Sequence, residues 1–173
     1  MRIESFPPIS DKSSSIALLG TMPGEKSLQT NTYFANNTNQ FWKILFTLLN
    51  QEFSDDYSVR KQLLLANGIA LWDVLKACSR ETDAPHPAPS SLDKYISQEV
   101  PNDFAAFYAE HPQIQHVFFL GQKALAAYEK HVVAPAKVLH VLPSPSGANT
   151  SMSFQQKVAE WKVILKFIES PLK

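Results

Sequence analysis

The side chains best suited to chemistry gather in two stretches of this chain, residues 20–39 and residues 142–149. The first reads GTMPGEKSLQTNTYFANNTN, and the second reads LPSPSGAN. An amide such as that of Asn39 can orient a water molecule, and the ring of Tyr33 or Phe34 can stack on a flat ligand. Serine hydroxyls and the bare N–H groups of a glycine turn can approach a phosphate closely. The chemistry of this chain should therefore depend on which ligand these two stretches hold.

A phosphate-binding loop is the first interpretation to test, because GTMPGEKS nearly matches the pattern G-x-x-x-x-G-K-[ST]. Gly20, Lys26 and Ser27 fall in place, but Glu25 stands where the second glycine belongs. A glutamate there adds a Cβ atom and a negative charge where backbone N–H groups must close around phosphates. Such a loop also runs directly into a helix, and we do not expect LQTNTYFANN to begin one. The pattern therefore disfavours a nucleotide triphosphatase, although IALWD at Ile69–Asp73 is similar to its magnesium-binding strand.

Metal chemistry and nucleophilic catalysis find little support in the sequence. The histidines lack zinc-ligand spacing, and a single cysteine cannot complete a usual zinc site, so we expect no metal ion and no cofactor. Ser144 and His140 could serve a small-molecule hydrolase as nucleophile and base, but no nucleophile elbow surrounds the serine. This hydrolase stays open as an alternative. The histidines are His86, His111, His116, His131 and His140.

The elements that must position these stretches alternate between strand and helix patterns. Short apolar runs predict buried strands at Ile16–Gly20, 69–72, 117–120 and Val138–Leu142. Amphipathic spacing and capping residues predict helices over 40–50, 58–66, 103–110, 122–133 and 153–168. Asn67-Gly68 should end the second helix, and Ser153 with Gln156 should cap the last. The prolines of residues 80–91 predict a loop.

Apolar strands separated by helices predict a parallel sheet that is covered on both faces. We therefore expect one α/β domain over residues 1–173, a three-layer α/β/α sandwich with a central, mostly parallel four-stranded sheet. Ligands bind at the carboxyl ends of the strands in such folds. Four connections fall at that edge, namely residues 21–39, residues 73–91, the turn at Gly121, and residues 143–151. The two stretches that carry the chemistry therefore belong to one predicted site.

Composition limits the classes of protein and of partner. The 173 residues are 45% apolar and 18% charged, which is typical of one globular domain with a sizeable core. The 16 basic and 16 acidic side chains cancel, so a nucleic acid would have to bind a local surface. Cys78, the only cysteine, excludes an internal disulfide and a four-thiolate iron–sulfur cluster. Without an apolar leader or an apolar run of about 18 residues, we expect a cytoplasmic monomer with no membrane contact.

Three segments in register resemble the uracil-DNA glycosylase superfamily, and together they cover nearly the whole chain. GTMPG at Gly20–Gly24 is similar to the G-x-N-P-G segment of its mismatch-specific branch. YFANNTNQFWKIL at Tyr33–Leu45 resembles the F-A-x-P-x-N-x-F-W-K segment of that branch. LPSPSGAN at Leu142–Asn149 resembles its L-P-x-P-S-G-x segment, and the order and spacing of the three also agree.

One difference indicates a particular branch of this superfamily. Mismatch-specific enzymes carry a catalytic asparagine where this chain has Met22, whose thioether cannot orient water through strong hydrogen bonds. The segment G-x-M-P-G is instead similar to the hypoxanthine-DNA glycosylase branch, also called DNA-deoxyinosine glycosylase. GIALWDVL at 68–75, SSLD at 90–93 and NDF at 102–104 also resemble segments of that branch. The resemblance places the catalytic residue at Asn39, in the segment x-N-x-F-W.

The resemblance implies a role for each stretch. Asn39 would orient the attacking water, although an asparagine here could also simply cap the helix that follows. Phe34, or alternatively Tyr33, would stack on the extruded base. The implied base-binding residues are Thr21, Met22, Pro23, Gly24, Tyr33, Phe34 and Asp73. The implied DNA-binding residues are Ser144, Pro145, Ser146, Gly147, Ala148 and Asn149.

Several of these residues also have structural interpretations. The Pro-Ser-Gly run can form a turn without any partner, and Asp73 can equally bind loop N–H groups. Ala148 stands where the related branch often carries a leucine that is wedged into the duplex. Lys43, Arg60 and Arg80 are candidate phosphate contacts only.

The resemblance implies hydrolysis of the N-glycosidic bond of a deaminated base in DNA, hypoxanthine first and uracil second, in base excision repair. The transition state resembles an oxocarbenium ion, with negative charge moving onto the departing base. The enzyme must flip the nucleotide, stack the base and place a water beneath the sugar. DNA containing a deaminated base is the expected partner, with nucleoid association during action. A catalytically inactive DNA- or nucleobase-binding protein of the same fold is the alternative, since Met22 and Ala148 are consistent with lost catalysis.

Overall fold

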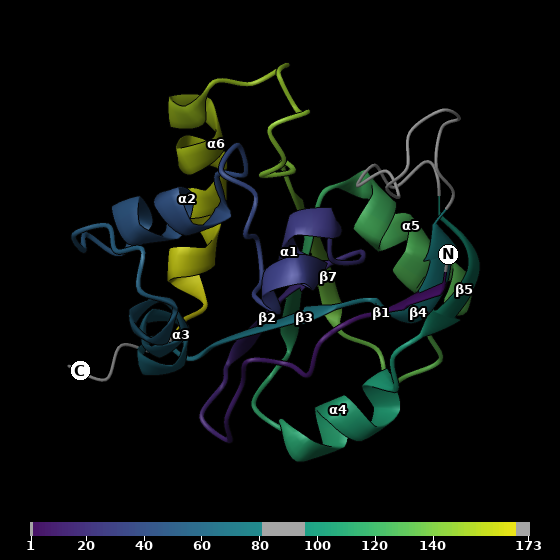
Figure 1. Cartoon of the computed structure of the whole chain (residues 1–173). Helices are drawn as coiled ribbons and strands as arrows, with labels where there is room; N and C mark the ends of the chain where they lie inside the picture. The colour runs from purple at the N-terminus through teal and green to yellow at the C-terminus, as the bar shows by residue number, and fades with distance from the viewer. Residues whose placement is uncertain (1, 81–95, 169–173) are drawn as a thin grey trace, which may run out of the picture.

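A four-stranded parallel sheet lies at the centre of the fold. The computed structural model describes residues 2–80 and 96–168 of the chain (Figure 1). The strands β2 (Ile16–Gly20), β3 (Ile69–Asp73), β6 (His116–Leu120) and β7 (Val138–Leu142) follow the order β3-β2-β6-β7. Gly20 pairs with Asp73 in the register of β2 and β3, so the carboxyl ends of these two strands are level. The predicted sheet is confirmed, with strand bounds within one residue of those expected.

Both faces of this sheet are buried over β2, β3 and β6, as the apolar runs predict. The predicted burial is wrong for most of the edge strand β7, where Val138, Leu139 and Val141 are exposed. All of β2 is buried, and its apolar residues point alternately to two separate hydrophobic clusters. Ile16 and Leu18 belong to one cluster, whereas Ala17 and Leu19 belong to the other. This alternation follows from the two-residue period of a strand, and it requires helices on both sides of the sheet.

One outer layer consists of helices that contribute to the cluster of Ile16 and Leu18 (Figure 1). Its members are α2 (Phe41–Leu48), α3 (Tyr57–Ala66), α6 (Phe154–Trp161) and a 3-10 helix at Lys162–Lys166. The predicted capping box is present at the start of α6. The last predicted helix differs in one respect, because its final turns tighten into the 3-10 form.

The other outer layer holds α4 (Phe104–Glu110) and α5 (Gln122–His131), which contribute to the second cluster. The two helical layers together confirm the expected three-layer α/β/α sandwich. Asp103 caps α4, since its side chain accepts a hydrogen bond from the Ala106 N–H at 3.0 Å. No helix within residues 2–80 and 96–168 has both the length and the apolar character needed to cross a membrane.

The sequence does not predict a second, antiparallel sheet, which the structure contains. Its strands β1 (Arg2–Glu4), β4 (Leu75–Arg80) and β5 (Ile96–Pro101) follow the order β1-β4-β5. The predicted connection at residues 73–91 is therefore wrong over residues 75–80. The reason is that Val74 alone separates β4 from β3, so no connection of several residues marks the end of one strand and the start of the next.

A short helix, α1 (Glu25–Thr30), follows the GTMPG loop and corrects the expectation that no helix begins there. Gly24 stands at its N-cap without a capping side-chain hydrogen bond, so the usual sequence signal of a helix start is missing. Asn31 ends the helix in the left-handed region, with a φ of 56°. The predicted loop at residues 80–91 lies, apart from its first residue, outside the described residues, as do the SSLD segment and His86.

Gly68 provides a test of how α3 is joined to β3. Its φ is +68°, and an added Cβ would meet the Ser15 hydroxyl oxygen at 3.0 Å. Gly68→Ala should lower the free energy of unfolding by about 1–2 kcal/mol, because an L-residue is strained at positive φ. Gly68→Asn is the matched control, since it adds the same Cβ but tolerates the left-handed region, so it should lose less. Urea titration measures both variants, and equal losses would mean that the steric contact, rather than backbone strain, sets the cost.

Candidate active site

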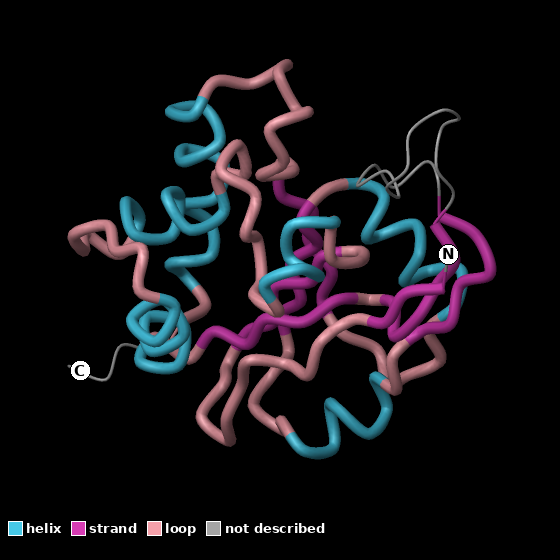
Figure 2. Tube along the Cα trace, in the orientation of Figure 1, coloured by secondary structure: helices cyan, strands magenta, loops and turns pink. Residues whose placement is uncertain are grey.

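A cavity of about 520 Å³ opens at the carboxyl ends of the parallel strands. It is bounded by the loop after β2, the segment before α2, the end of β3 and the loop after β7, and Figure 2 shows these connections as loops beside the sheet. Every predicted site residue lines it, from Thr21 near the start of the chain to Asn149 near its end. Their roles stay predictions, but their common location follows from the parallel sheet, which collects these connections at one edge.

Asn39 is held rigidly just before α2. Its Oδ1 accepts a hydrogen bond from the Phe41 N–H at 2.9 Å, and its own N–H donates to the Asn36 carbonyl at 3.0 Å. Because a backbone N–H can only donate, this bond identifies the side-chain oxygen and fixes the orientation of the amide. The N-cap of α2 is Gln40, one residue later than the sequence predicts, but the Asn39 side chain still binds the first N–H of the helix, which is compatible with the catalytic interpretation. One lone pair of Oδ1 serves the helix, and the other lone pair and the Nδ2 group can serve a ligand.

Phe34 lines the same cavity from a strained backbone. Its φ is 55°, in a region that a bulky side chain seldom adopts. The ring stacks on Phe41, with centroids 4.2 Å apart and planes inclined by 21°. The next residue is fixed as well, because the Ala35 N–H donates to the Ser27 Oγ at 3.1 Å. A strained residue that its neighbours hold in place is typical of a functional position.

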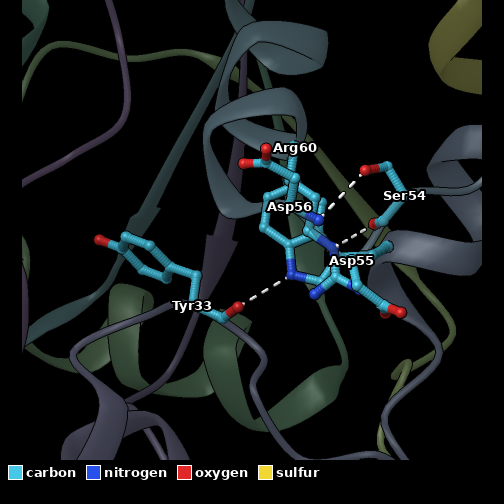
Figure 3. A network of polar contacts seen from close by, with 6 residues as sticks. Tyr33, Ser54, Asp55, Asp56 and Arg60 are labelled. Carbon is cyan, nitrogen blue, oxygen red and sulfur yellow. Dashed lines mark hydrogen bonds and ion pairs between the residues drawn. The ribbon is translucent and has the colours of Figure 1, made fainter.

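Tyr33 lines the cavity, but its hydroxyl and its carbonyl form hydrogen bonds with other parts of the fold, and Figure 3 shows the bond of the carbonyl. Its hydroxyl donates to the Pro7 carbonyl at 2.9 Å, and its carbonyl accepts a hydrogen bond from the Trp42 indole at 2.9 Å. Burial, assisted by the nearby Asp73, raises the pKa of the Tyr33 hydroxyl above its ordinary value, so the group stays neutral. Phe34 is therefore better placed than Tyr33 to stack on a ligand.

Asp73 ends β3 and lines the cavity with a side chain that is 3% exposed. Gly20 lies opposite on β2, and an added Cβ there would come within 2.7 Å of the Asp73 Oδ1. Only a glycine leaves the carboxylate this space. The NDF segment supports the same residue, because the Asn102 Nδ2 donates to the Asp73 carbonyl at 2.8 Å.

The carbonyl groups of the GTMPG loop accept hydrogen bonds that hold the loop in place. The Gly20 carbonyl accepts the Val74 N–H at 2.8 Å, which ties the loop to the end of β3. Arg80 donates from Nη1 to the Pro23 carbonyl at 2.7 Å, and its side chain is 1% exposed. Arg80 therefore supports this loop, and its burial removes it as a candidate phosphate contact. Met22 lines the cavity above these bonds.

The loop after β7 is built around its serines. The Ser144 Oγ accepts the Ser146 N–H at 3.3 Å, and the Ser146 Oγ accepts the Ala148 N–H at 3.1 Å. The Asn149 Nδ2 donates to the Ser144 carbonyl at 3.0 Å. These bonds form the turn that the sequence predicts, and Gly147 and Ala148 are exposed at its tip.

This loop is joined directly to the segment that carries Asn39. The Gln40 N–H donates to the Pro145 carbonyl at 2.8 Å. Gly147 lies against Thr38, where an added Cβ would meet the Thr38 Oγ1 at 2.5 Å and its carbonyl oxygen at 2.9 Å. The groups predicted to orient water and the groups predicted to bind DNA therefore belong to one continuous side of the cavity.

Several residues that line the cavity escape the sequence analysis. Lys26 and Lys123 bring positive charge to it from the first turns of α1 and α5. Asn36 shapes the turn before Asn39, since its Oδ1 accepts the Thr38 N–H at 2.9 Å and the Thr38 hydroxyl at 2.8 Å. The near match to a phosphate loop is the one sequence signal that singles out Lys26. The remaining lining residues are Gly20, Glu25, Ser27, Thr38 and Leu120.

The structure also bears on the phosphate-loop interpretation. One of the two objections to it falls away, because α1 does follow the GTMPG loop. The other objection stands, since Glu25 occupies the first turn of α1 and lines the cavity, where its charge would repel a phosphate. The mismatch at Glu25 therefore still disfavours a nucleotide triphosphatase.

Arg60 and Lys43, two candidate phosphate contacts, do not line the cavity. Arg60 donates from Nε to the Ser54 carbonyl at 2.8 Å and forms an ion pair with Asp55 at 3.2 Å (Figure 3). Its guanidinium also lies over the Trp42 ring, 5.6 Å from the centroid. Arg60 therefore holds the connection between α2 and α3, while Lys43 lies exposed on α2.

His140 is not placed to act as a base for Ser144. Its Nε2 forms a hydrogen bond with the His116 Nδ1 at 3.0 Å, and its ring stacks on Phe118 with centroids 4.4 Å apart. Ser144 lines the cavity and His140 does not, so the geometry gives no support to a small-molecule hydrolase. Over residues 2–80 and 96–168, the His, Cys, Asp and Glu side chains form no group of three that could hold a metal ion.

Comparison with known proteins agrees with this geometry. A hypoxanthine DNA glycosylase of Methanosarcina acetivorans is 32% identical over 162 residues, which is 93% of this chain and 96% of that protein. A protein of the same name from Methanosarcina barkeri is 31% identical over 167 residues, 96% of this chain and 99% of that protein. A solution NMR structure from Methanosarcina acetivorans, described as a candidate uracil DNA glycosylase, has a TM-score of 0.77 at 30% identity, covering 96% and 98% of the two chains.

The family comparison covers nearly the whole fold. The family model of the uracil DNA glycosylase superfamily matches residues 7–166, which include both loops that join at Gln40 and Pro145. The matched range also contains all four strands of the parallel sheet. The chain belongs to the uracil DNA glycosylase superfamily.

Proposed function

We propose that this protein is a DNA glycosylase that hydrolyses the N-glycosidic bond of a deaminated nucleotide, hypoxanthine in preference to uracil, in base excision repair. The proposal depends on one observation above all, that Asn39, Phe34 and the loop of residues 143–149 line a single cavity. The cavity volume is within the range of small-ligand sites, about 300–1,000 Å³. The names of the Methanosarcina relatives support hypoxanthine as the preferred base.

Discrimination between hypoxanthine and adenine follows from the donors and acceptors around the cavity. Hypoxanthine and uracil both carry a ring N–H beside a carbonyl, whereas adenine presents a bare ring nitrogen beside an amino group. The carboxylate of Asp73 would accept the ring N–H and would repel the lone pair of adenine. Backbone N–H groups between Thr21 and Gly24 are the candidate donors to the carbonyl of the base.

The hydrolysis itself would depend on Asn39 and on charge stabilisation. The second lone pair of the Asn39 Oδ1 would accept a hydrogen bond from the attacking water and hold it beneath the sugar. An amide does not take up a proton at neutral pH, so Asn39 orients the water and does not act as a strong base. Most of the acceleration would therefore come from N–H groups near Met22 that stabilise the negative charge on the departing base.

The protein can grip DNA locally although its net charge is zero. Small hydroxyl groups and the bare backbone at Gly147 allow a phosphate to approach the loop after β7. Lys26 and Lys123 line the same cavity, where their positive charges offset the negative charges of Glu25 and Asp73. A local surface of this kind would bind the backbone on both sides of an extruded nucleotide.

A second candidate function is binding of DNA or a nucleobase without hydrolysis. Ala148 favours it, because this residue lies exposed at the tip of the loop after β7, where its methyl group would fill a vacated base stack poorly. A protein that holds an already unpaired base would not need a larger wedge.

Base release from labelled duplexes tests the proposed function. The wild type should release hypoxanthine from deoxyinosine, uracil more slowly from deoxyuridine, and no adenine from deoxyadenosine. Asn39→Ala should lower the single-turnover rate about 100- to 1,000-fold, because the attacking water loses its hydrogen-bond acceptor. Asn37→Ala is the matched control, since Asn37 is exposed in the same segment and does not line the cavity.

Two outcomes would contradict different parts of this proposal. A wild type that binds the duplex but releases no base would favour the second candidate function. Undiminished release by Asn39→Ala would instead remove Asn39 from the mechanism. The variant loses the bond to the Phe41 N–H, which costs about 1 kcal/mol, so a melting curve should show that it remains folded.

Phe34 should contribute through stacking on the extruded base. Phe34→Ala should lower kcat/KM for the deoxyinosine duplex about 10- to 100-fold, since such a stack is worth about 1–3 kcal/mol. Phe34→Tyr keeps the ring and should stay close to the wild type. Steady-state assays of both variants give the comparison, and a wild-type kcat/KM for Phe34→Ala would mean that the ring only supports Phe41.

A further inference from the structure

Lys157 on α6 is a buried lysine that the proposed mechanism does not use. Its side chain is 2% exposed, and its Nζ donates to the Gln40 Oε1 at 2.8 Å. The Nζ also lies 3.5 Å from the Ser146 carbonyl oxygen. None of the ion pairs found among residues 2–80 and 96–168 includes Lys157. Neutral oxygens therefore solvate this ammonium, and no carboxylate of the described residues forms an ion pair with it.

Burial has an electrostatic consequence for this group. It lowers the pKa of Lys157 from the ordinary lysine value, because removal from water disfavours the charged form. An anion that binds nearby would offset this cost, and the low dielectric constant of the protein interior would leave their attraction less screened than it is in water. The charge of Lys157 should thus attract an anion that binds the outer side of the loop of residues 143–149.

The loop of residues 143–149 is held from beneath by its carbonyl groups. Trp161, one turn after Lys157 on α6, donates from Nε1 to the Pro143 carbonyl at 3.0 Å. The Gln40 N–H holds the Pro145 carbonyl, and Lys157 lies against the Ser146 carbonyl. The C=O and N–H groups of a trans peptide point in opposite directions, so the N–H groups of residues 144, 146 and 147 turn away from these donors. The Ser146 N–H donates to the Ser144 Oγ, so the N–H groups of residues 144 and 147 are the ones offered to a ligand.

We propose that Lys157 is a positioning residue that places a positive charge beneath the loop of residues 143–149 and thereby draws a DNA phosphate onto its outward N–H groups. The inference rests on the proposed function, because it assigns this loop to the DNA backbone. Lys157 is too deeply buried to touch the phosphate and acts through the loop. Its bond to Gln40, the neighbour of Asn39, places the phosphate relative to the residue that orients water.

A simpler role for Lys157 would be that of a neutral brace, which joins α6 to Gln40 by a hydrogen bond and nothing more. The two roles differ in their dependence on charge. The bracing role would persist in Lys157→Gln, because glutamine can still donate a hydrogen bond. It would be lost in Lys157→Met. A charge beneath the phosphate is lost in both variants.

The salt dependence of DNA binding separates these roles. The ligand is a duplex that carries 2′-fluoro-deoxyinosine, whose glycosidic bond resists hydrolysis, so that binding is measured without turnover. Fluorescence anisotropy over a series of salt concentrations gives Kd and the slope of log Kd against log salt. Lys162→Met is the matched control, since Lys162 follows directly after α6 and is exposed.

Lys157→Met and Lys157→Gln should both raise Kd about tenfold and lower the slope by up to about 0.9, the contribution of one neutralised phosphate. Lys162→Met should keep the wild-type slope. On a cleavable deoxyinosine duplex, both Lys157 variants should raise KM and leave kcat unchanged, because a phosphate contact is made equally before and in the transition state.

A wild-type slope in both Lys157 variants, or in Lys157→Gln alone, would overturn the inference and leave Lys157 as a brace. A wild type that binds the duplex but releases no hypoxanthine from deoxyinosine would overturn the proposed catalysis, while the slope would still test Lys157. A wild type that does not bind the duplex would overturn both.

Discussion

The direct contact between the segment before α2 and the loop after β7 is the constraint on which the candidate site depends. Parallel strands bring these two connections to the same edge of the sheet, but they do not set the distance between them. That distance is fixed by the bond from the Gln40 N–H to the Pro145 carbonyl and by the packing of Gly147 on Thr38. The outer layer that contains α2 and α6 thus determines the geometry at which water and DNA would meet.

The sheet could be predicted from the sequence because its cause is local. Strands that are buried on both faces are apolar along their whole length, and runs such as Ile16–Gly20 show this directly. The antiparallel sheet has no such local cause. β1 is only three residues long, and its pairing with β4 joins segments far apart in the chain. The helix α1 escaped prediction because Gly24 provides no capping side chain and because the helix is short.

The sequence predicts the location of the site, but it does not predict the conformation of the residues that form it. The motifs identify the two loops, and the parallel sheet brings them together. The left-handed φ of Phe34 could not be predicted, because no sequence rule assigns that conformation to an aromatic residue. The burial of Lys157 was not predicted either, because lysines are seldom buried, although its spacing from Phe154 and Trp161 places it on the apolar face of α6. Both features arise from contacts with segments that are distant in sequence or in a different element.

The strained backbone at Phe34 has a consequence for how a ligand would enter. The ring lies on Phe41, and the residues on either side are tied to Trp42 and Ser27, so the platform is complete before anything arrives. The conformational entropy of ordering this aromatic surface is lost when the chain folds and is not lost again on association. A binding site of this kind does not change its conformation when the ligand binds. The slow motion on the way to the bound state should therefore belong to the nucleic acid, whose unstacking would limit how often the platform is occupied.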